Sequence, residues 1–95
     1  MMDFIYQPNR IYAVNEAGKL VAEVIFPGRS EKTVEITHTF VDDSLRGQGI
    51  AGQLLEAVAA KLRSEHKKAY PSCPYAVKWF ESHPEAKDVY AEKST

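Results

Sequence analysis

The chain has 95 residues, of which 44% are hydrophobic, and its 12 lysines and arginines oppose 13 aspartates and glutamates. This length and composition fit one compact globular domain, which we expect to span residues 1–95, and they argue against disorder. The charges are balanced and not segregated, so the basic stripe of a nucleic-acid-binding protein is missing. We therefore expect no nucleic-acid partner.

The ends of the chain and its cysteine and histidine content argue against further kinds of protein and of site. The N-terminus has no basic and apolar signal region, and no apolar run approaches the ~20 residues of a transmembrane helix. We expect a cytoplasmic protein without a membrane partner. The single cysteine, Cys73, excludes an internal disulfide, and the three histidines show no metal-ligand spacing, so we expect no metal site.

The N-terminal part of the chain has the pattern of a β-meander. Short β-type runs at residues 4–6 and 11–14 are separated by a Pro-Asn turn, and a turn containing Gly18 leads into a third run at residues 20–26. A Pro-Gly turn then reverses the chain again. These signals predict successive antiparallel strands.

Residues 33–41 form the longest predicted strand. Apolar or aromatic-ring side chains alternate there with threonine and glutamate: Val34, Ile36, His38 and Phe40. Such alternation is typical of a strand with one buried face. We therefore expect His38 on the apolar face of this strand.

The hydrophobic period changes after the following loop. Apolar residues now recur every four positions: Ile50, Leu54, Val58 and Leu62. This period predicts an amphipathic helix that ends near His66. Residues 69–72 are predicted to form a short extended segment. Pro74 suits the first position of a helix, so we predict a second helix that begins there and ends at about Ser82.

These elements predict an α+β fold with a strongly curved, mostly antiparallel sheet of about five strands. The last strand should run parallel to residues 33–41, with the amphipathic helix as the crossover between them. The glycine-rich segment before that helix then lies at one end of a C-terminal βαβ unit.

The glycine-rich segment from Arg46 to Gly52 lies between a strand and a helix. The first backbone N–H groups of a helix have no intrahelical partner, and the helix dipole favours negative charge there. Glycine allows a close approach of the backbone, and Arg46 adds a charged donor. We predict that this segment binds the pyrophosphate of a nucleotide-like cofactor, with a tight turn as the simpler alternative.

Two other phosphate-binding motifs fit less well. The string from Gly47 to Gly52 also satisfies the dinucleotide fingerprint, but that motif requires an acidic residue about 20 positions further on. The corresponding residues 67–72 contain no carboxylate. A phosphate loop would need Lys-Ser or Lys-Thr after the glycines, and neither is present.

The segment from His38 to Glu85 resembles the GCN5-related N-acetyltransferase superfamily, and within it the small YjdJ-like members. Arg46, Gly49 and Ala51 match the pyrophosphate loop of that superfamily. The resemblance also includes further groups of residues: His38-Thr39, Leu45-Arg46-Gly47-Gln48-Gly49-Ile50, Cys73-Pro74 and His83-Pro84-Glu85.

The resemblance implies a minimal acetyltransferase fold in which the two parallel strands splay apart and receive the pantetheine arm of acetyl coenzyme A. It assigns cofactor contacts to ten residues: Phe40, Val41, Arg46, Gly47, Gln48, Gly49, Ile50, Ala51, Gly52 and Tyr75. The implied reaction transfers an acetyl group to an amine, on a small molecule or a protein lysine. The helical pair that shapes the acceptor site in larger members is missing, so a partner protein would complete the site.

Cys73 and His38 are the candidate catalytic residues. Cys73 precedes Pro74, which places its thiol near a helix N-terminus where a thiolate is favoured, although a free cysteine is also commonly a small buried residue. His38 suits a general base by its chemistry, and its alternative is a hydrogen-bonded core residue. Tyr75 either protonates a leaving thiolate or packs.

Three other functions remain open from the sequence. The acetyl group could pass first to Cys73, or the domain could only bind and sense acetyl coenzyme A. A scaffold protein without a cofactor is the simplest alternative. Binding of coenzyme A distinguishes the scaffold from the others, and turnover distinguishes an enzyme from a sensor.

Overall fold

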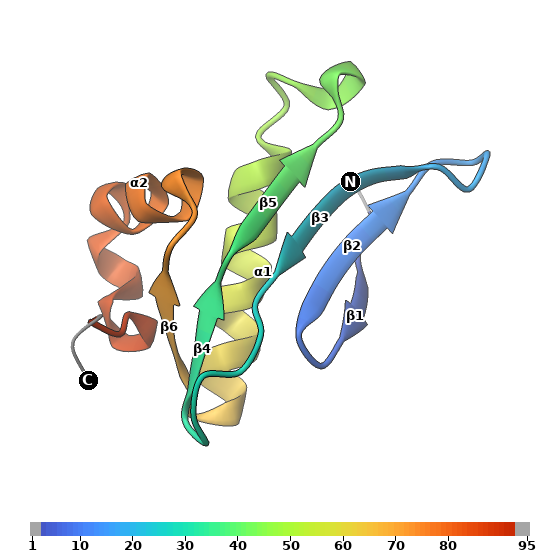
Figure 1. Cartoon of the computed structure of the whole chain (residues 1–95). Helices are drawn as coiled ribbons and strands as arrows, with labels where there is room; N and C mark the ends of the chain where they lie inside the picture. The colour runs from blue at the N-terminus through green and yellow to red at the C-terminus, as the bar shows by residue number, and fades with distance from the viewer. Residues whose placement is uncertain (1–2, 93–95) are drawn as a thin grey trace.

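The computed structural model describes residues 3–92, and Figure 1 shows its strands and helices in chain order. The strands are β1 (Ile5–Gln7), β2 (Arg10–Val14), β3 (Leu20–Ile25), β4 (Thr33–Ile36), β5 (His38–Val41) and β6 (Lys68–Pro71). The α-helices are α1 (Ile50–Glu65) and α2 (Pro74–Ser82), and the 3₁₀ turns are η1 (Asp43–Leu45) and η2 (Pro84–Val89). The predicted α+β class is confirmed.

The strands form an antiparallel sheet in the order β1-β2-β3-β5 and a separate parallel pair, β4 and β6. The parallel register runs from Thr33 opposite Lys68 to Ile36 opposite Pro71. Helix α1 is the crossover between the parallel strands, as predicted. The predicted antiparallel meander and C-terminal βαβ unit are therefore both present.

The longest predicted strand is in fact two strands, separated by a β-bulge at Thr37. The Thr37 N–H donates to the carbonyl of Ile25 over 3.1 Å, although the register already pairs Ile25 with His38. Two residues of one strand therefore oppose a single residue, and the inward and outward positions shift by one. Val34 and Ile36 are buried, but the His38 side chain is 52% exposed. The prediction that His38 lies on the apolar face is wrong for this reason.

The same shift decides which residues of β5 face the core. Thr39 pairs with buried Val24, and Val41 pairs with buried Ala22. Directly opposed residues of an antiparallel pair share a face of the sheet. Thr39 and Val41 therefore face the core, whereas Phe40 lies on the other face.

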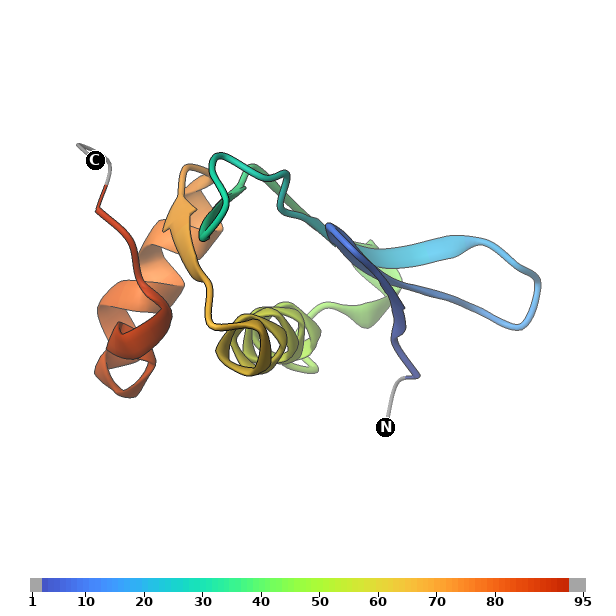
Figure 2. The same cartoon turned by 90° about the horizontal axis from the view of Figure 1, so that it is seen from below.

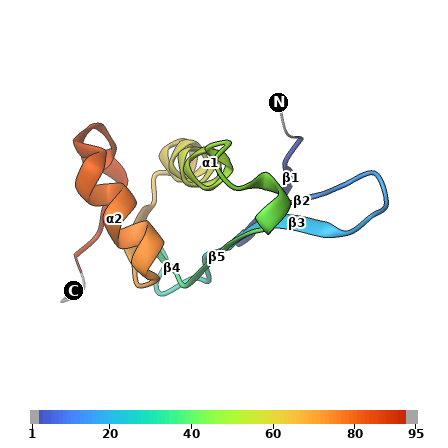
Figure 3. The ribbon, with the colours of Figure 1, turned by 90° about the horizontal axis from the view of Figure 1, so that it is seen from above.

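Helix α1 covers one face of the antiparallel sheet. It contacts β2, β3 and β5, and its buried residues are Ile50, Leu54, Leu55, Val58, Ala59 and Leu62. Burying a leucine or isoleucine side chain contributes roughly 1.5–3 kcal/mol. Figures 2 and 3 show that no helix of residues 3–92 lies over the opposite face of this sheet. Within the described part of the chain, one face of the sheet is packed against a helix and the other is not; we call the second the open face.

Candidate functional site

The loop between β5 and α1 leaves the first turn of the helix without a side-chain cap. Gly47 and Gly49 have φ angles of 84° and 73°, a region that side chains of L-residues rarely adopt. Gly49 is the N-cap residue of α1, and no side chain accepts a hydrogen bond from the N–H groups that follow it. These donors and the helix dipole have the chemistry that favours an anion.

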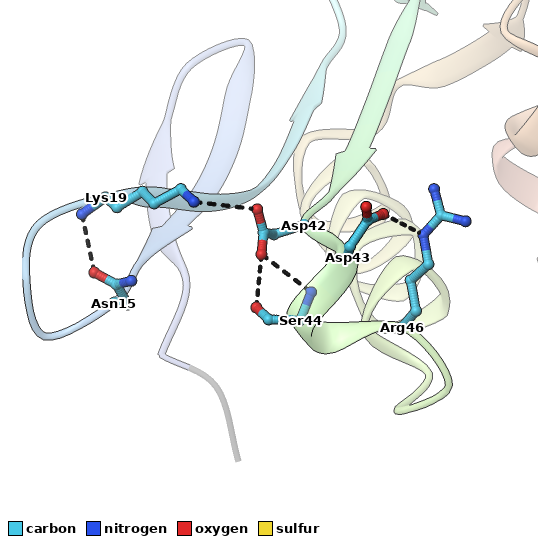
Figure 4. Close-up of polar contacts among 6 residues, drawn as sticks. All are labelled: Asn15, Lys19, Asp42, Asp43, Ser44 and Arg46. Carbon is cyan, nitrogen blue, oxygen red and sulfur yellow. Dashed lines mark hydrogen bonds and ion pairs between the residues drawn. The ribbon is translucent and has the colours of Figure 1, made fainter.

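Acidic side chains near this loop already have partners, as Figure 4 shows. Asp42 accepts hydrogen bonds from the Ser44 hydroxyl at 2.6 Å and the Ser44 N–H at 3.1 Å. These bonds, the hydroxyl first, hold the pKa of Asp42 below its ordinary value. Asp43 Oδ1 lies 2.8 Å from Arg46 Nε on a guanidinium side chain that is 76% exposed. Arg46 is therefore accessible to an anion that competes with Asp43.

A hollow of about 170 Å³ lies in front of this helix end. Its lining residues come from β5, the loop, α1 and α2: Val41, Leu45, Arg46, Gly47, Gly49, Ile50, Ala51, Gly52 and Tyr75. The structure thus brings together the predicted cofactor contacts except Gln48 and Phe40, which do not line the hollow. Leu45 was missed, although an apolar residue inside an otherwise polar loop is a weak signal for it.

Tyr75 lies across the hollow from the glycine loop. A Cβ atom added to Gly52 would stand 3.8 Å from the Tyr75 hydroxyl, so this hydroxyl lies over the first turn of α1. Burial raises the pKa of Tyr75 above its ordinary value of 10.0. The hydroxyl is therefore protonated at neutral pH and is a hydrogen-bond donor.

Strand β5 has one free edge, because it is the last strand of the antiparallel sheet. The N–H of Asp42, just beyond β5, donates to Val21 of the sheet over 2.8 Å. Neighbouring residues of a strand direct their backbone groups to opposite edges. Thr39 and Val41 therefore direct their N–H and C=O groups away from β3, toward the free edge.

The free edge of β5 lies beyond the end of the parallel pair. The Ile36 carbonyl, at the end of β4, accepts the N–H groups of Ser72 at 3.0 Å and Cys73 at 3.1 Å. Beyond this point β5 continues alongside β3, whereas the chain after β6 turns into α2 (Figure 1). Strand β5 is therefore not paired with β6, and the backbone groups of Thr39 and Val41 on this edge have no strand partner among the described residues.

Cys73 lies where the two segments begin to diverge. It is the N-cap residue of α2, and its Sγ accepts the Ala76 N–H at 3.4 Å. The predicted position of Cys73 at the start of this helix is confirmed. Its Sγ is also 3.3 Å from the hydroxyl of Thr39 on β5, a contact that spacing along the chain does not reveal. Sulfur and hydroxyl thus meet at the point where the two segments diverge.

The structure does not bring His38 into the hollow or against Cys73. Its Nε2 lies 3.6 Å from Glu23 Oε1 on the open face of the sheet. His38 and Thr39 are consecutive, however, so their side chains leave β5 on opposite faces at the same end of the strand. The imidazole and the thiol therefore flank one short stretch of backbone.

A larger cavity of about 430 Å³ lies elsewhere, between β6, α2 and η2. Its walls include the rings of Tyr70, Phe80 and Tyr90. A diphosphate needs several convergent donors and positive charge. The smaller hollow, and not this cavity, is lined by the free helix end and Arg46.

Within residues 3–92 no group of three or more histidine, cysteine or acidic side chains is arranged to hold a metal ion. Over the same range, none of the helices has the length and hydrophobicity needed to cross a bilayer.

Known proteins are similar to this chain in sequence and architecture. A family model described as GCN5-related N-acetyl-transferase matches residues 10–89. Protein NATD1 of Xenopus tropicalis is 35% identical over 63 residues, a match that covers 66% of this chain and 58% of that protein. The chain therefore spans less than two thirds of the length of this curated relative.

Two solved structures are similar to this fold. The first is a GCN5-like putative N-acetyltransferase from Staphylococcus aureus, with a TM-score of 0.80 and 28% identity over 98% of this chain and 91% of that chain. The second is a GNAT family N-acetyltransferase from Escherichia coli in complex with CoA. It gives a TM-score of 0.54 and 25% identity over 61% of this chain and 35% of that chain.

Proposed function

Because the chain belongs to the GCN5-related N-acetyltransferase family, we propose that it binds acetyl coenzyme A and transfers the acetyl group to an amine. The observation that carries the proposal is the uncapped N-terminus of α1, which lies beside the free edge of β5. Coenzyme A contains a diphosphate and an extended amide-bearing arm. The helix end suits the diphosphate, and the strand edge suits the amide-bearing arm.

The proposed roles follow from what each residue can donate. The N–H groups at the start of α1 and the Arg46 guanidinium bind the diphosphate, while Thr39 and Val41 offer backbone hydrogen bonds to the pantetheine amides. The bound cofactor would supply the thioester whose acetyl group is transferred. The Tyr75 hydroxyl donates to a phosphate or to the departing thiolate. The Escherichia coli relative in complex with CoA supports this choice of cofactor.

The first prediction is that coenzyme A raises the melting temperature of the protein, whereas NAD does not. A ligand at 100 times its dissociation constant adds about 2.7 kcal/mol, which corresponds to roughly 10–20 °C in a domain of this size. Thermal scans with increasing coenzyme A, acetyl coenzyme A and NAD provide the measurement. Equal stabilisation by NAD would remove the reason for choosing coenzyme A.

The acceptor is an amine of a small molecule or of a protein lysine, and a screen of acetyl coenzyme A turnover against polyamines, amino acids and lysine peptides would identify its class. The open face of the sheet leaves room for a partner protein that completes the acceptor site. Tight binding of coenzyme A without turnover in this screen would favour a sensing domain. We place the protein in the cytoplasm, where acetyl coenzyme A is available.

A second mechanism is favoured by the contacts of Cys73. Its sulfur lies at a helix N-terminus and beside the Thr39 hydroxyl, at the inner end of the β5 edge to which we assign the pantetheine arm. In this mechanism the acetyl group passes to Cys73 Sγ and then to the amine.

The second prediction separates these routes with the Cys73→Ser variant. If Cys73 carries the acetyl group, the variant loses at least about a hundredfold in turnover, because a serine hydroxyl is a far weaker nucleophile than a thiolate. Its coenzyme A affinity stays within about threefold of the wild type. Mass spectrometry of the intact wild type with acetyl coenzyme A alone should show one added acetyl group on Cys73. Normal turnover of the variant, with no acetylated wild type, would leave direct transfer as the mechanism.

A further inference from the structure

Glu23 is enclosed on the sheet face that no helix of the described chain covers. Its side chain is only 12% exposed, and its Oε2 accepts a hydrogen bond from Arg10 Nε at 2.5 Å. Its other oxygen, Oε1, lies 3.6 Å from His38 Nε2. A carboxylate removed from water in this way requires charged partners. Arg10 is the charged partner on Oε2, and the His38 imidazole lies beside Oε1.

The strand register explains why these three residues meet. Arg10 and His38 are both paired with Ile25 of β3, one from β2 and the other from β5. Glu23 lies two residues from Ile25 on the same face of β3, so both side chains reach it diagonally. The bulge at Thr37 is required, because without it His38 would point toward the core.

Arg10 is itself held in place. Its guanidinium carbon lies 3.8 Å from the centre of the Tyr12 ring, and its Nη1 lies 3.4 Å from Gln7 Oε1. A guanidinium stacked on an aromatic ring has few alternative positions. Arg10 therefore occupies Glu23 Oε2, and Oε1 remains available to His38.

We propose that Glu23 is a positioning residue for His38 in the acetyl transfer, an inference that rests on the proposed function. Glu23 orients the imidazole with Nε2–H toward Oε1, which leaves Nδ1 to take the proton of the acceptor amine. The amine nitrogen forms its bond to the acetyl carbon while the carbon–sulfur bond breaks and its electron pair leaves with sulfur. The carboxylate stabilises the imidazolium that results.

Tyr12 of β2 directly opposes Glu23 on this face. Further charged or titratable groups lie along β4 and β6. Glu35 of β4 is paired with Arg29 at 3.6 Å, and the Arg29 guanidinium lies 5.0 Å from the ring centre of Tyr70 on β6. Glu35 thus has its own cation, and Glu23 is the carboxylate that contacts His38. This makes Glu35→Gln a matched control: a glutamate on the same face, 31% exposed and paired with an arginine.

The direct test is NMR of the histidine ring nitrogens in the full chain. In the wild type the neutral His38 ring should carry its proton on Nε2, and Glu23→Gln should shift it to a mixture of the two tautomers. The Glu35→Gln control should leave His38 unchanged, and His66 and His83 serve as internal references in every sample. An unchanged His38 tautomer in a folded Glu23→Gln variant would overturn the proposal.

Kinetics test the consequence for the reaction. With the amine found by the acceptor screen, Glu23→Gln should lower kcat at least about tenfold while the KM for acetyl coenzyme A stays unchanged. The factors by which Glu23→Gln and His38→Gln lower kcat should not multiply in the double variant, because both residues act on one proton transfer. Multiplying losses would contradict the proposal. If wild type neither binds coenzyme A nor turns over, the proposed function fails, and the NMR result still decides whether Glu23 positions His38.

Discussion

Replacing Gly49 with valine is expected to weaken coenzyme A binding by at least about tenfold, which is 1.4 kcal/mol of binding free energy. Gly49 has a φ of 73° at the N-cap of α1, and a Cβ atom there would meet nothing within 4 Å. The new side chain would therefore stand in the open hollow where we place the diphosphate. It would also strain the backbone by about 1–2 kcal/mol and turn the helix N–H groups away. Calorimetric titration with coenzyme A measures the loss.

Gly18→Val is the matched control for this variant. Gly18 has a φ of 81° in the turn between β2 and β3, and a Cβ atom there also meets nothing within 4 Å. The two variants should lose similar stability, but the Gly18 variant should keep full coenzyme A affinity. If Gly49→Val bound coenzyme A as tightly as the control, the loop would be only a turn.

The largest loss of stability is expected from Leu54→Ala. Leu54 is 0% exposed and lies on the face of α1 that packs against the sheet. Removing a fully buried leucine side chain costs about 2–5 kcal/mol through lost burial and the cavity left behind. In a domain of this size the melting temperature should fall by more than about 8 °C. Urea unfolding followed by circular dichroism gives the free energy directly.

The control for Leu54→Ala is Glu56→Ala on the same helix. Glu56 is exposed, so its replacement should change the free energy of unfolding by less than about 0.5 kcal/mol. A loss below 1 kcal/mol for Leu54→Ala would mean that α1 is not the principal cover of the sheet. The packing described for the core would then be incorrect.

The helices and the glycine loop could be predicted from the sequence because their signals are local. The four-residue period starts at Ile50, where α1 begins, and Pro74 is the first residue of α2. The positive φ angles of Gly47 and Gly49 match the reason for expecting glycine there. Each of these features depends on neighbouring residues in the chain.

The bulge at Thr37 and the contacts it creates could not be predicted in this way. Threonine is a good strand residue on either face, so an alternating pattern continues through Thr37 without a visible break. The position of His38 depends on a backbone hydrogen bond to Ile25, and its contact with Glu23 depends on the register of neighbouring strands. The Thr39 contact with Cys73 likewise joins residues 34 positions apart. Only the assembled sheet brings these groups together.

The free edge of β5 also affects how the protein behaves in solution. An edge with unpaired N–H and C=O groups is a template on which a strand of another chain can add, and such addition leads to aggregation. The edge that we assign to the pantetheine arm cannot be blocked permanently without losing the ligand. The chain limits the hazard by other means, because β5 has only four residues and is followed at once by Asp42 and Asp43. A bound ligand on this edge would protect the protein from self-association as well as take part in the reaction.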